Sequence, residues 1–452
     1  MRLRTGLYYA ALATPALAVM GIALVADPAR AVPSFARQTG VDCSACHVGG
    51  FGPQLTPFGR RFKLTGYTAN NGEFNVPLSA MAVGSWTHTA KDQPGGAGTH
   101  AGPNDNFALD EVSAFLAGKI AGPVGAFVQV TYDGNEHHVS LDNADIRAAV
   151  ETQLGGRDLI LGASFNNNPT VQDAFNTTPA WGFPYTGSAL TPDSNAGTLI
   201  NGGAEMQVGG ASVYAYWNNL LYAEVGVYSR LSESFLSTVG VSRETVVKGT
   251  APYWRLALTH DWSQQSASIG TFGMIADVYP DDLHLSGTDK YTDIGFDASY
   301  QWLGDRKDII SANLSYVHEK QDRTGSYALG LAANPRDTLN ELKANLSWYH
   351  DNAYGLTAGF FRTSGSADPL LYPVEDITGS RLGLPDTTGY VLQADWTPFG
   401  KADSWGGSWA NLRLGLQYTG YTKFNGAGSN YDGAGRKASD NNTLFLFSWL
   451  AF

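Results

Sequence analysis

Hydrophobic and polar residues alternate with a period of two along much of this 452-residue chain. Between residues 342 and 349, for example, Leu342, Ala344, Leu346 and Trp348 share one side of an extended chain, and mostly polar residues take the other. Successive side chains of a β-strand point to opposite faces, so the pattern predicts strands with one apolar and one polar face. Segments of about ten such residues are typical of transmembrane β-barrels, whose outer face meets lipid and whose inner face meets water.

Sixteen segments alternate in this way, and they predict an all-β fold: a transmembrane antiparallel β-barrel of about sixteen strands over residues 77–452. A soluble β-sandwich also alternates, but the regular placement of Tyr and Trp at strand ends favours a membrane barrel. The segments begin near residues 77, 107, 125, 141, 156, 204, 220, 251, 265, 290, 307, 338, 353, 388, 409 and 440.

The connections between these segments alternate in length. The short ones include residues 121–123, 218–219, 304–306 and 351–352, and the long ones are residues 91–106, 166–203, 231–250, 320–337, 365–387 and 422–439. Outer-membrane barrels pair short periplasmic turns with long outer loops, so we expect both ends of the barrel on the periplasmic side.

Two further features of the barrel sequence resemble outer-membrane proteins. The last strand ends on Phe452, and a terminal aromatic residue of this kind resembles an outer-membrane assembly signal. The longest connection, residues 166–203, occupies the place of the third outer loop, which in porins commonly folds inward and narrows the channel. Its Pro and aromatic content predicts a fixed structure. The alternative is an exposed lid without a role in substrate passage.

The first residues of the chain resemble a secretory signal peptide. Two arginines precede an apolar run over residues 7–26, and the small-residue sequence of residues 29–31 follows it. An uncleaved membrane helix is the alternative, because the run is long enough to span a bilayer. Pro15 and the Ala-x-Ala site favour a signal peptide over residues 1–31 that is removed on export.

The only two cysteines of the chain lie in the sequence Cys43-Ser44-Ala45-Cys46-His47. This spacing predicts attachment of a c-type haem: both thiols add to the porphyrin vinyl groups, and the imidazole of His47 binds the iron. Thioredoxin-like redox sites, structural disulfides and half-zinc sites share the Cys-x-x-Cys spacing. No second cysteine pair is present to complete a zinc site, and no βαβ pattern surrounds the motif.

Residues 32–76 therefore form a predicted monohaem cytochrome c head, placed at or inside the periplasmic mouth of the barrel. A domain this small buries too little surface to remain folded without a stabilising group such as haem. Residues 48–80 contain no His, Met or Cys, so a sixth iron ligand must come from the barrel or be absent. Strand parity turns Met81 into the lumen and makes it the leading candidate. The other candidates are His88, His100, Met206 and an open position.

Three cations, Arg60, Arg61 and Lys63, follow the motif closely. They can pair with the haem propionates, because cationic side chains and carboxylates form strong charge-assisted hydrogen bonds. Alternatively, they form a solvated face that contacts acidic walls of the lumen.

The charge balance and the motifs exclude several classes of function. The net charge is −12, and it becomes −14 without residues 1–31, which argues against nucleic acid and for cationic ligands or basic partners. No Ser/His/Asp triad, phosphate loop or second metal motif is present, so bond-making catalysis is unsupported.

Residues 35–40, 43–47, 55–60 and 62–67 together resemble the fused monohaem cytochrome-porins of bacterial outer membranes. The resemblance spans the mature chain and is strongest in the head. It implies one covalent haem c held by Cys43, Cys46 and His47. It also implies that the protein takes electrons from extracellular Fe(II) or another reductant and passes them to a periplasmic electron-carrier protein. Whether this makes it an enzyme, an Fe(II) oxidase, stays open.

Two other functions fit the same residues. The chain can be a solute-diffusion porin in which the haem head is a plug or gate. It can also be a conduit with a donor other than iron, or one that carries electrons outward.

Overall fold

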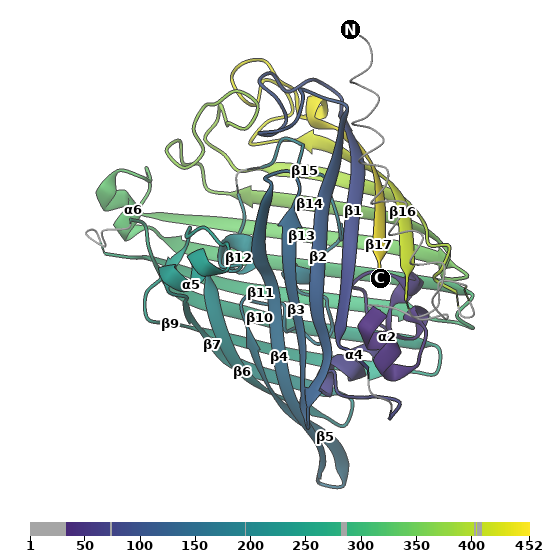
Figure 1. Ribbon diagram of the computed structural model, residues 1–452. Helices are drawn as coiled ribbons and strands as arrows, with labels where there is room; N and C mark the ends of the chain where they lie inside the picture. The colour runs from purple at the N-terminus through teal and green to yellow at the C-terminus, as the bar shows by residue number, and fades with distance from the viewer. Residues whose placement is uncertain (1–32, 73–74, 195, 282–286, 402–403, 405–408) are drawn as a thin grey trace, which may run out of the picture.

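The computed structural model describes residues 33–72, 75–194, 196–281, 287–401, 404 and 409–452, and the predicted signal peptide lies outside them. Sixteen strands of the described residues close into one antiparallel barrel (Figure 1). Each strand pairs with its neighbours in sequence, and β17 pairs with β1 to close the sheet. A two-residue strand, β8, adds a short pairing with β10. The sixteen-strand antiparallel barrel predicted from alternation is therefore confirmed.

The barrel strands are β1 (Leu78–Thr89), β2 (Asn106–Ala121), β3 (Val124–Asp133), β4 (His138–Leu154), β5 (Arg157–Asn166), β6 (Val208–Trp217), β7 (Leu221–Arg230), β9 (Thr250–Asp261), β10 (Gln265–Tyr279), β11 (Asp289–Trp302), β12 (Asp308–Asp322), β13 (Arg336–His350), β14 (Tyr354–Gly365), β15 (Thr387–Trp396), β16 (Asn411–Lys423) and β17 (Thr443–Ala451). The remaining elements are α2 (Pro33–Thr39), α3 (Cys43–Cys46), η1 (Val48–Gly50), α4 (Pro57–Leu64), η2 (Pro179–Trp181), η3 (Leu199–Gly203), α5 (Glu233–Thr238), β8 (Val246–Val247), α6 (Thr324–Leu329) and η4 (Ala438–Asn441).

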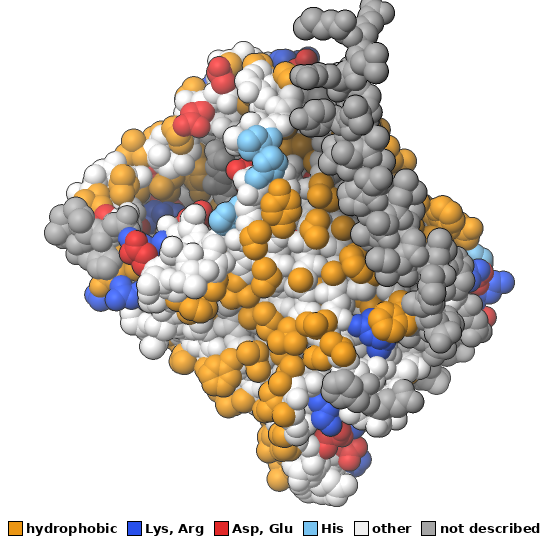
Figure 2. All heavy atoms as spheres, viewed as in Figure 1, with side chains coloured by type: hydrophobic (Ala, Val, Ile, Leu, Met, Phe, Trp, Pro, Cys, Tyr) orange, Lys and Arg blue, Asp and Glu red, His pale blue; other side chains and the backbone are white. Residues whose placement is uncertain are grey.

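The two faces of the barrel wall differ as the alternation predicts. On β11, Phe296 is 52% exposed on the outside, whereas Asp293 and Asp297 are buried on the inside. Figure 2 shows hydrophobic side chains spread over the outer surface of the strands at the front. An outer wall of this composition is stable in lipid, whereas the inner wall is polar. Within the described residues, no helix is both long and apolar enough to cross a membrane.

The longest connection, loop L3 (residues 167–207), folds into the barrel. Leu199 and Ile200 are buried. Three backbone N–H groups at the start of η3 donate to three carboxylates on the inner faces of β11, β12 and β13. The pairs are Thr198 with Glu341 (3.1 Å), Leu199 with Glu319 (2.6 Å) and Ile200 with Asp293 (3.0 Å). The inward course expected for this loop is confirmed, and it is not an exposed lid.

The N-terminal residues 33–72, which we call the plug segment, lie against the inner wall at the end of the barrel that carries the short turns. Val48 packs with Leu303, Ile309 and Tyr349, which lie in or beside two of these turns. Gln301 Nε2 donates to the backbone oxygen of Leu55 at 2.8 Å. The plug segment and loop L3 together occupy the lumen.

The last residue helps to close the barrel. Phe452 N–H donates to Ala80 O at 2.8 Å, and Ala80 N–H donates to Phe452 O at 2.7 Å. Each such bond contributes about 1 kcal/mol. We expect deletion of Phe452 to reduce the amount of folded barrel, measured by heat-modifiable migration on gels. The comparison variant Phe452→Ala keeps both backbone bonds and loses only the ring, so an equal loss of folded barrel in both variants would assign the effect to the terminal aromatic signal. Undiminished folded barrel in the deletion variant would contradict the prediction.

Candidate functional site

The Cys-x-x-Cys-His sequence forms one helical turn followed by an extended residue. In α3, His47 N–H donates to Cys43 O at 2.8 Å, and His47 itself has extended backbone angles, φ −117° and ψ 135°. The chain then turns back, since Val48 N–H donates to Gln54 O at 2.9 Å and Thr56 N–H donates to Cys46 O at 2.9 Å. This return places α4 directly against the motif.

Helix α4 approaches the motif closely because residue 59 is glycine. A Cβ on Gly59 would lie 2.3 Å from Cys46 O, a distance at which the two backbones must separate. Thr56 caps the helix, as its Oγ1 accepts from Gly59 N–H at 3.3 Å. The hydroxyl of Thr56 also donates to Ala45 O, so one side chain joins the start of α4 to α3.

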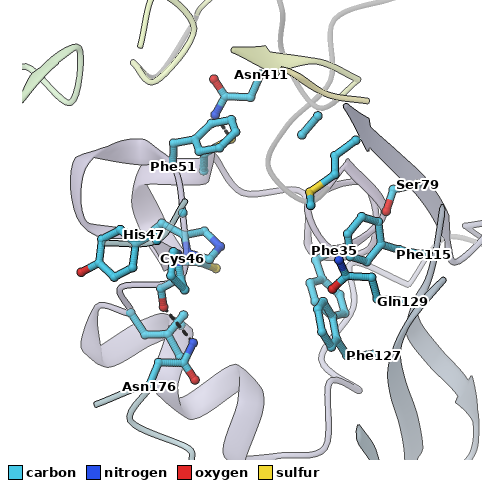
Figure 3. A pocket seen from close by; sticks show the side chains of 18 of the residues that line it. Phe35, Cys46, His47, Phe51, Ser79, Phe115, Phe127, Gln129, Asn176 and Asn411 are labelled. Carbon is cyan, nitrogen blue, oxygen red and sulfur yellow. Dashed lines mark hydrogen bonds between the residues drawn. The ribbon is translucent and has the colours of Figure 1, made fainter. Parts of the chain in front are cut away.

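A cavity of about 360 Å³, which we call the site cavity, opens beside the motif. The plug segment, β1, β2, β3 and loop L3 contribute most of its lining. In Figure 3, Cys46 and His47 lie on one side, and Phe35, Phe115 and Phe127 face them from the opposite side. The lining includes Cys43, Cys46, His47, Lys63, Met81 and Trp449. The chain therefore gathers both thiols, the imidazole and a thioether around one space that is lined mainly by apolar side chains.

His47 lies deep in the protein, and its ring borders the site cavity. The pKa of His47 is lowered to about 4, mainly by burial and also by the nearby Arg413 guanidinium. A backbone hydrogen bond with Gly52 opposes both effects. The Nδ1 atom is buried and has no hydrogen-bond partner among the described residues. His47 is thus neutral at pH 7, the state in which an imidazole nitrogen can bind a metal ion.

The two cysteines are separate thiols in the structure. Cys43 is buried, and Asn411 Nδ2 donates to its Sγ at 3.2 Å. The pKa of Cys46 is raised to about 12, because the effect of burial exceeds the opposing effect of the nearby Arg306 charge. Cys46 is therefore a protonated thiol, and both cysteines border the site cavity.

Met81 is the distal candidate that the structure brings into the site cavity. It belongs to the lumen-facing set of β1, in which Val83 and Thr87 are buried. Trp449 Nε1 on β17 donates to Met81 Sδ at 3.2 Å. The thioether of Met81 and the imidazole of His47 therefore border the same space.

The other distal candidates are placed elsewhere, outside the described lining of the site cavity. His88 pairs with Asp105 at 2.9 Å on the exposed surface. His100 stacks on His137 with 4.2 Å between ring centroids. Met206 lies near the end of loop L3 with a positive φ of 59°.

The three cations after the motif contact the wall and loop L3. Arg60 pairs with Asp261 at 2.6 Å, and Arg61 pairs with Glu151. These two contacts with acidic groups of the wall match the alternative that the sequence left open. Lys63 Nζ instead donates at 2.8 Å to Val171 O and at 2.8 Å to Asn176 Oδ1 of loop L3, and it borders the site cavity. Pairing with haem propionates stays a prediction for all three.

Several residues around the site have no distinguishing signal in the sequence. Tyr67 donates to Asp145 Oδ2 at 2.7 Å, and Arg147 Nε donates to the same oxygen at 2.7 Å. This buried network ties the end of the plug segment to β4. The sequence indicates such anchors only through charged residues at lumen-facing strand positions. This pattern does not identify the residue that each anchor contacts.

A second cavity of about 470 Å³, the outer cavity, lies between loop L3 and strands β13 to β17. Hydroxyl and amide groups line much of it, together with Asp193, Glu341 and Lys343. Pro184 borders both cavities, while Tyr185 borders the site cavity and Phe183 borders the outer one. A short stretch of loop L3 therefore separates the two spaces.

Comparison with known proteins finds similar solved structures. No protein-family model matches the chain, and no curated protein matches it. The outer membrane channel DcaP of Acinetobacter baumannii is 11% identical, with a TM-score of 0.43 over 86% of this chain and 99% of that chain. OmpT of Vibrio cholerae is 10% identical, with a TM-score of 0.41 over 84% and 97%. An anion-selective porin from Comamonas acidovorans is 13% identical, with a TM-score of 0.41 over 83% and 98%.

Proposed function

We propose that the site cavity holds one haem c, bound through Cys43 and Cys46, with His47 and Met81 as the two iron ligands. The observation behind this proposal is that these four side chains border one mainly apolar cavity, although they are spread over 39 residues of sequence and two structural units. A neutral His47 with an unpaired buried nitrogen suits the proximal position. When bound, haem c supplies one-electron oxidation and reduction, and ligation by a thioether raises its reduction potential.

We infer that the protein is an outer-membrane electron conduit. The apolar outer wall supports insertion in the outer membrane, and the alternation of short turns and long loops supports a periplasmic position for the plug segment. A periplasmic electron-carrier protein then meets the site from the short-turn end. The resemblance of the head to cytochrome-porins makes extracellular Fe(II) the first donor to test.

The filling of the lumen by the plug segment and loop L3 supports the conduit. A donor from the long-loop side reaches the outer cavity and is held away from the site cavity by residues 183–186 of loop L3. The plug segment fills the other end, fixed by Arg60 on Asp261 and by Arg61 on Glu151. Ferric iron precipitates near neutral pH. A filled lumen that passes electrons and excludes iron therefore leaves the ferric product outside the cell.

A plugged solute porin is the second candidate, and the barrel itself favours it. A closed barrel of sixteen strands is wide enough for an aqueous channel. The polar lining of the outer cavity suits a hydrated solute. In this function the plug segment opens the channel by leaving the wall, and the haem serves to hold the plug segment folded.

One experiment separates the two functions. Purified haem-loaded protein is mixed with Fe(II), and haem reduction is followed by absorbance; the same preparation is tested for ion conductance in planar bilayers. The haem-free double variant Cys43→Ala, Cys46→Ala is the control. Rapid reduction with little conductance supports the conduit. Conductance comparable to an open porin, without reduction, supports the plugged porin and overturns the conduit.

A further inference from the structure

Trp449, near the end of the last strand, directs its indole N–H at the sulfur of Met81, with 3.2 Å between Nε1 and Sδ. In the closing strand pair, Trp449 lies opposite Val83 and Met81 lies opposite Ala451. Met81 and Trp449 are therefore diagonal neighbours on the lumen face, at a separation that long and aromatic side chains span.

Trp449 is itself held in place by the plug segment. Its ring meets that of Phe51 edge to face, with 5.0 Å between centroids. Phe51 O in turn accepts from Arg413 Nη2 at 2.8 Å, and the Arg413 guanidinium lies 5.2 Å from the centre of the Phe51 ring. The indole thus sits between the loop that follows His47 and the sulfur of Met81.

The direction of this hydrogen bond matters for the sulfur. An indole N–H is a donor only, and a thioether is a weak acceptor with two lone pairs. A sulfur that accepts the indole N–H with one lone pair keeps the other for a metal ion. The N–H also withdraws electron density from the sulfur, which weakens its bond to ferric iron more than its bond to ferrous iron.

We propose that Trp449 is a positioning residue that orients the Met81 thioether toward the haem iron and raises the reduction potential of the haem. This inference rests on the proposed function, because it needs haem in the site cavity. In this inference the last barrel strand, which is remote in sequence from the plug segment, contributes to the chemistry of the haem site.

The test is the variant Trp449→Phe, which keeps an aromatic ring against Phe51 and removes the N–H. We expect the equilibrium between ferrous and ferric haem to shift toward ferric by up to about tenfold, equivalent to about 59 mV for one electron. The charge-transfer absorption band of Met-ligated ferric haem should shift or weaken. Trp348→Phe, on the outer face of β13, is the matched control and should leave both readings unchanged.

A double-variant cycle with Met81→Ala shows whether Trp449 acts through Met81. We expect Trp449→Phe to change the potential in the wild-type background and to have no effect once Met81 is replaced. An unchanged potential and spectrum in Trp449→Phe overturns the inference, and so does an equal shift in both backgrounds.

Two further controls keep the result clear. If Trp449→Phe fails to assemble, Phe51→Leu keeps the N–H and removes the edge contact, and the inference requires a smaller shift in the same direction. A wild-type protein without covalent haem overturns the proposed function itself, whereas a haem-loaded protein that is insensitive to Trp449→Phe overturns the inference alone.

Discussion

The double variant Cys43→Ala, Cys46→Ala is expected to lose covalent haem completely while the barrel still assembles. Each thioether bond needs one of these sulfurs, and the chain contains no other cysteine. The barrel should persist because strand pairing does not involve residues 43–46, and the contact of Cys43 with Asn411 is a single hydrogen bond. Haem staining after denaturing electrophoresis measures attachment, and heat-modifiable migration measures assembly.

Ser44→Ala is the matched control, since Ser44 lies between the two cysteines. It should retain wild-type staining. Staining of the double variant at the wild-type level would refute covalent attachment through these sulfurs, and with it the proposed site.

The second large effect is expected from Arg255→Ala. Arg255 is buried on β9, where its guanidinium lies 2.8 Å from Asp173 of loop L3 and 2.7 Å from Asp297 of β11. Removal of one partner from a buried ion pair costs about 3–5 kcal/mol, because the remaining charges lose their compensation. Repulsion between the two carboxylates should then separate loop L3 from the wall.

Release of loop L3 should also loosen the plug segment, because Lys63 is held by Val171 and Asn176 of that loop. We expect a several-fold rise in ion conductance in planar bilayers and faster cleavage of loop L3 by added protease. Arg336→Ala is the control, because Arg336 is a largely exposed residue whose Nε lies 3.7 Å from Asp322. Conductance and cleavage equal to wild type in Arg255→Ala would show that the buried pairs do not hold the loop.

Most strand positions follow from the sequence because alternation is a local property. Lipid on one face and a hydrogen-bonded lumen on the other impose it on each strand separately. The starts expected near residues 265 and 220 agree to within one residue with those of β10 at Gln265 and β7 at Leu221. The largest discrepancy is β6, expected near residue 204 and found at Val208. Residues 204–207 alternate as Ala, Glu, Met and Gln, but they form a turn in which Met206 has a positive φ of 59°, and local alternation does not distinguish this turn from the start of a strand.

The attachment motif is also a property of the sequence, since Cys43, Cys46 and His47 act through their spacing alone. The lumen-facing position of Met81 follows from strand parity in the same way. Neither argument predicts the contact of Trp449 with Met81. Every second residue of β17 faces the lumen, and the sequence does not tell which of them lies beside Met81 on β1.

The sequence by itself thus determined the closed barrel, its number of strands, the inner and outer faces and the residues of the attachment motif. The tertiary structure decided which lumen groups meet: Arg60 and Asp261 are 201 residues apart, and Trp449 and Met81 are 368 apart. The physical reason is that polar residues at lumen-facing positions all satisfy the same local pattern. Their partners depend on the register that closes the barrel and on the depth at which the plug segment and loop L3 pack inside it.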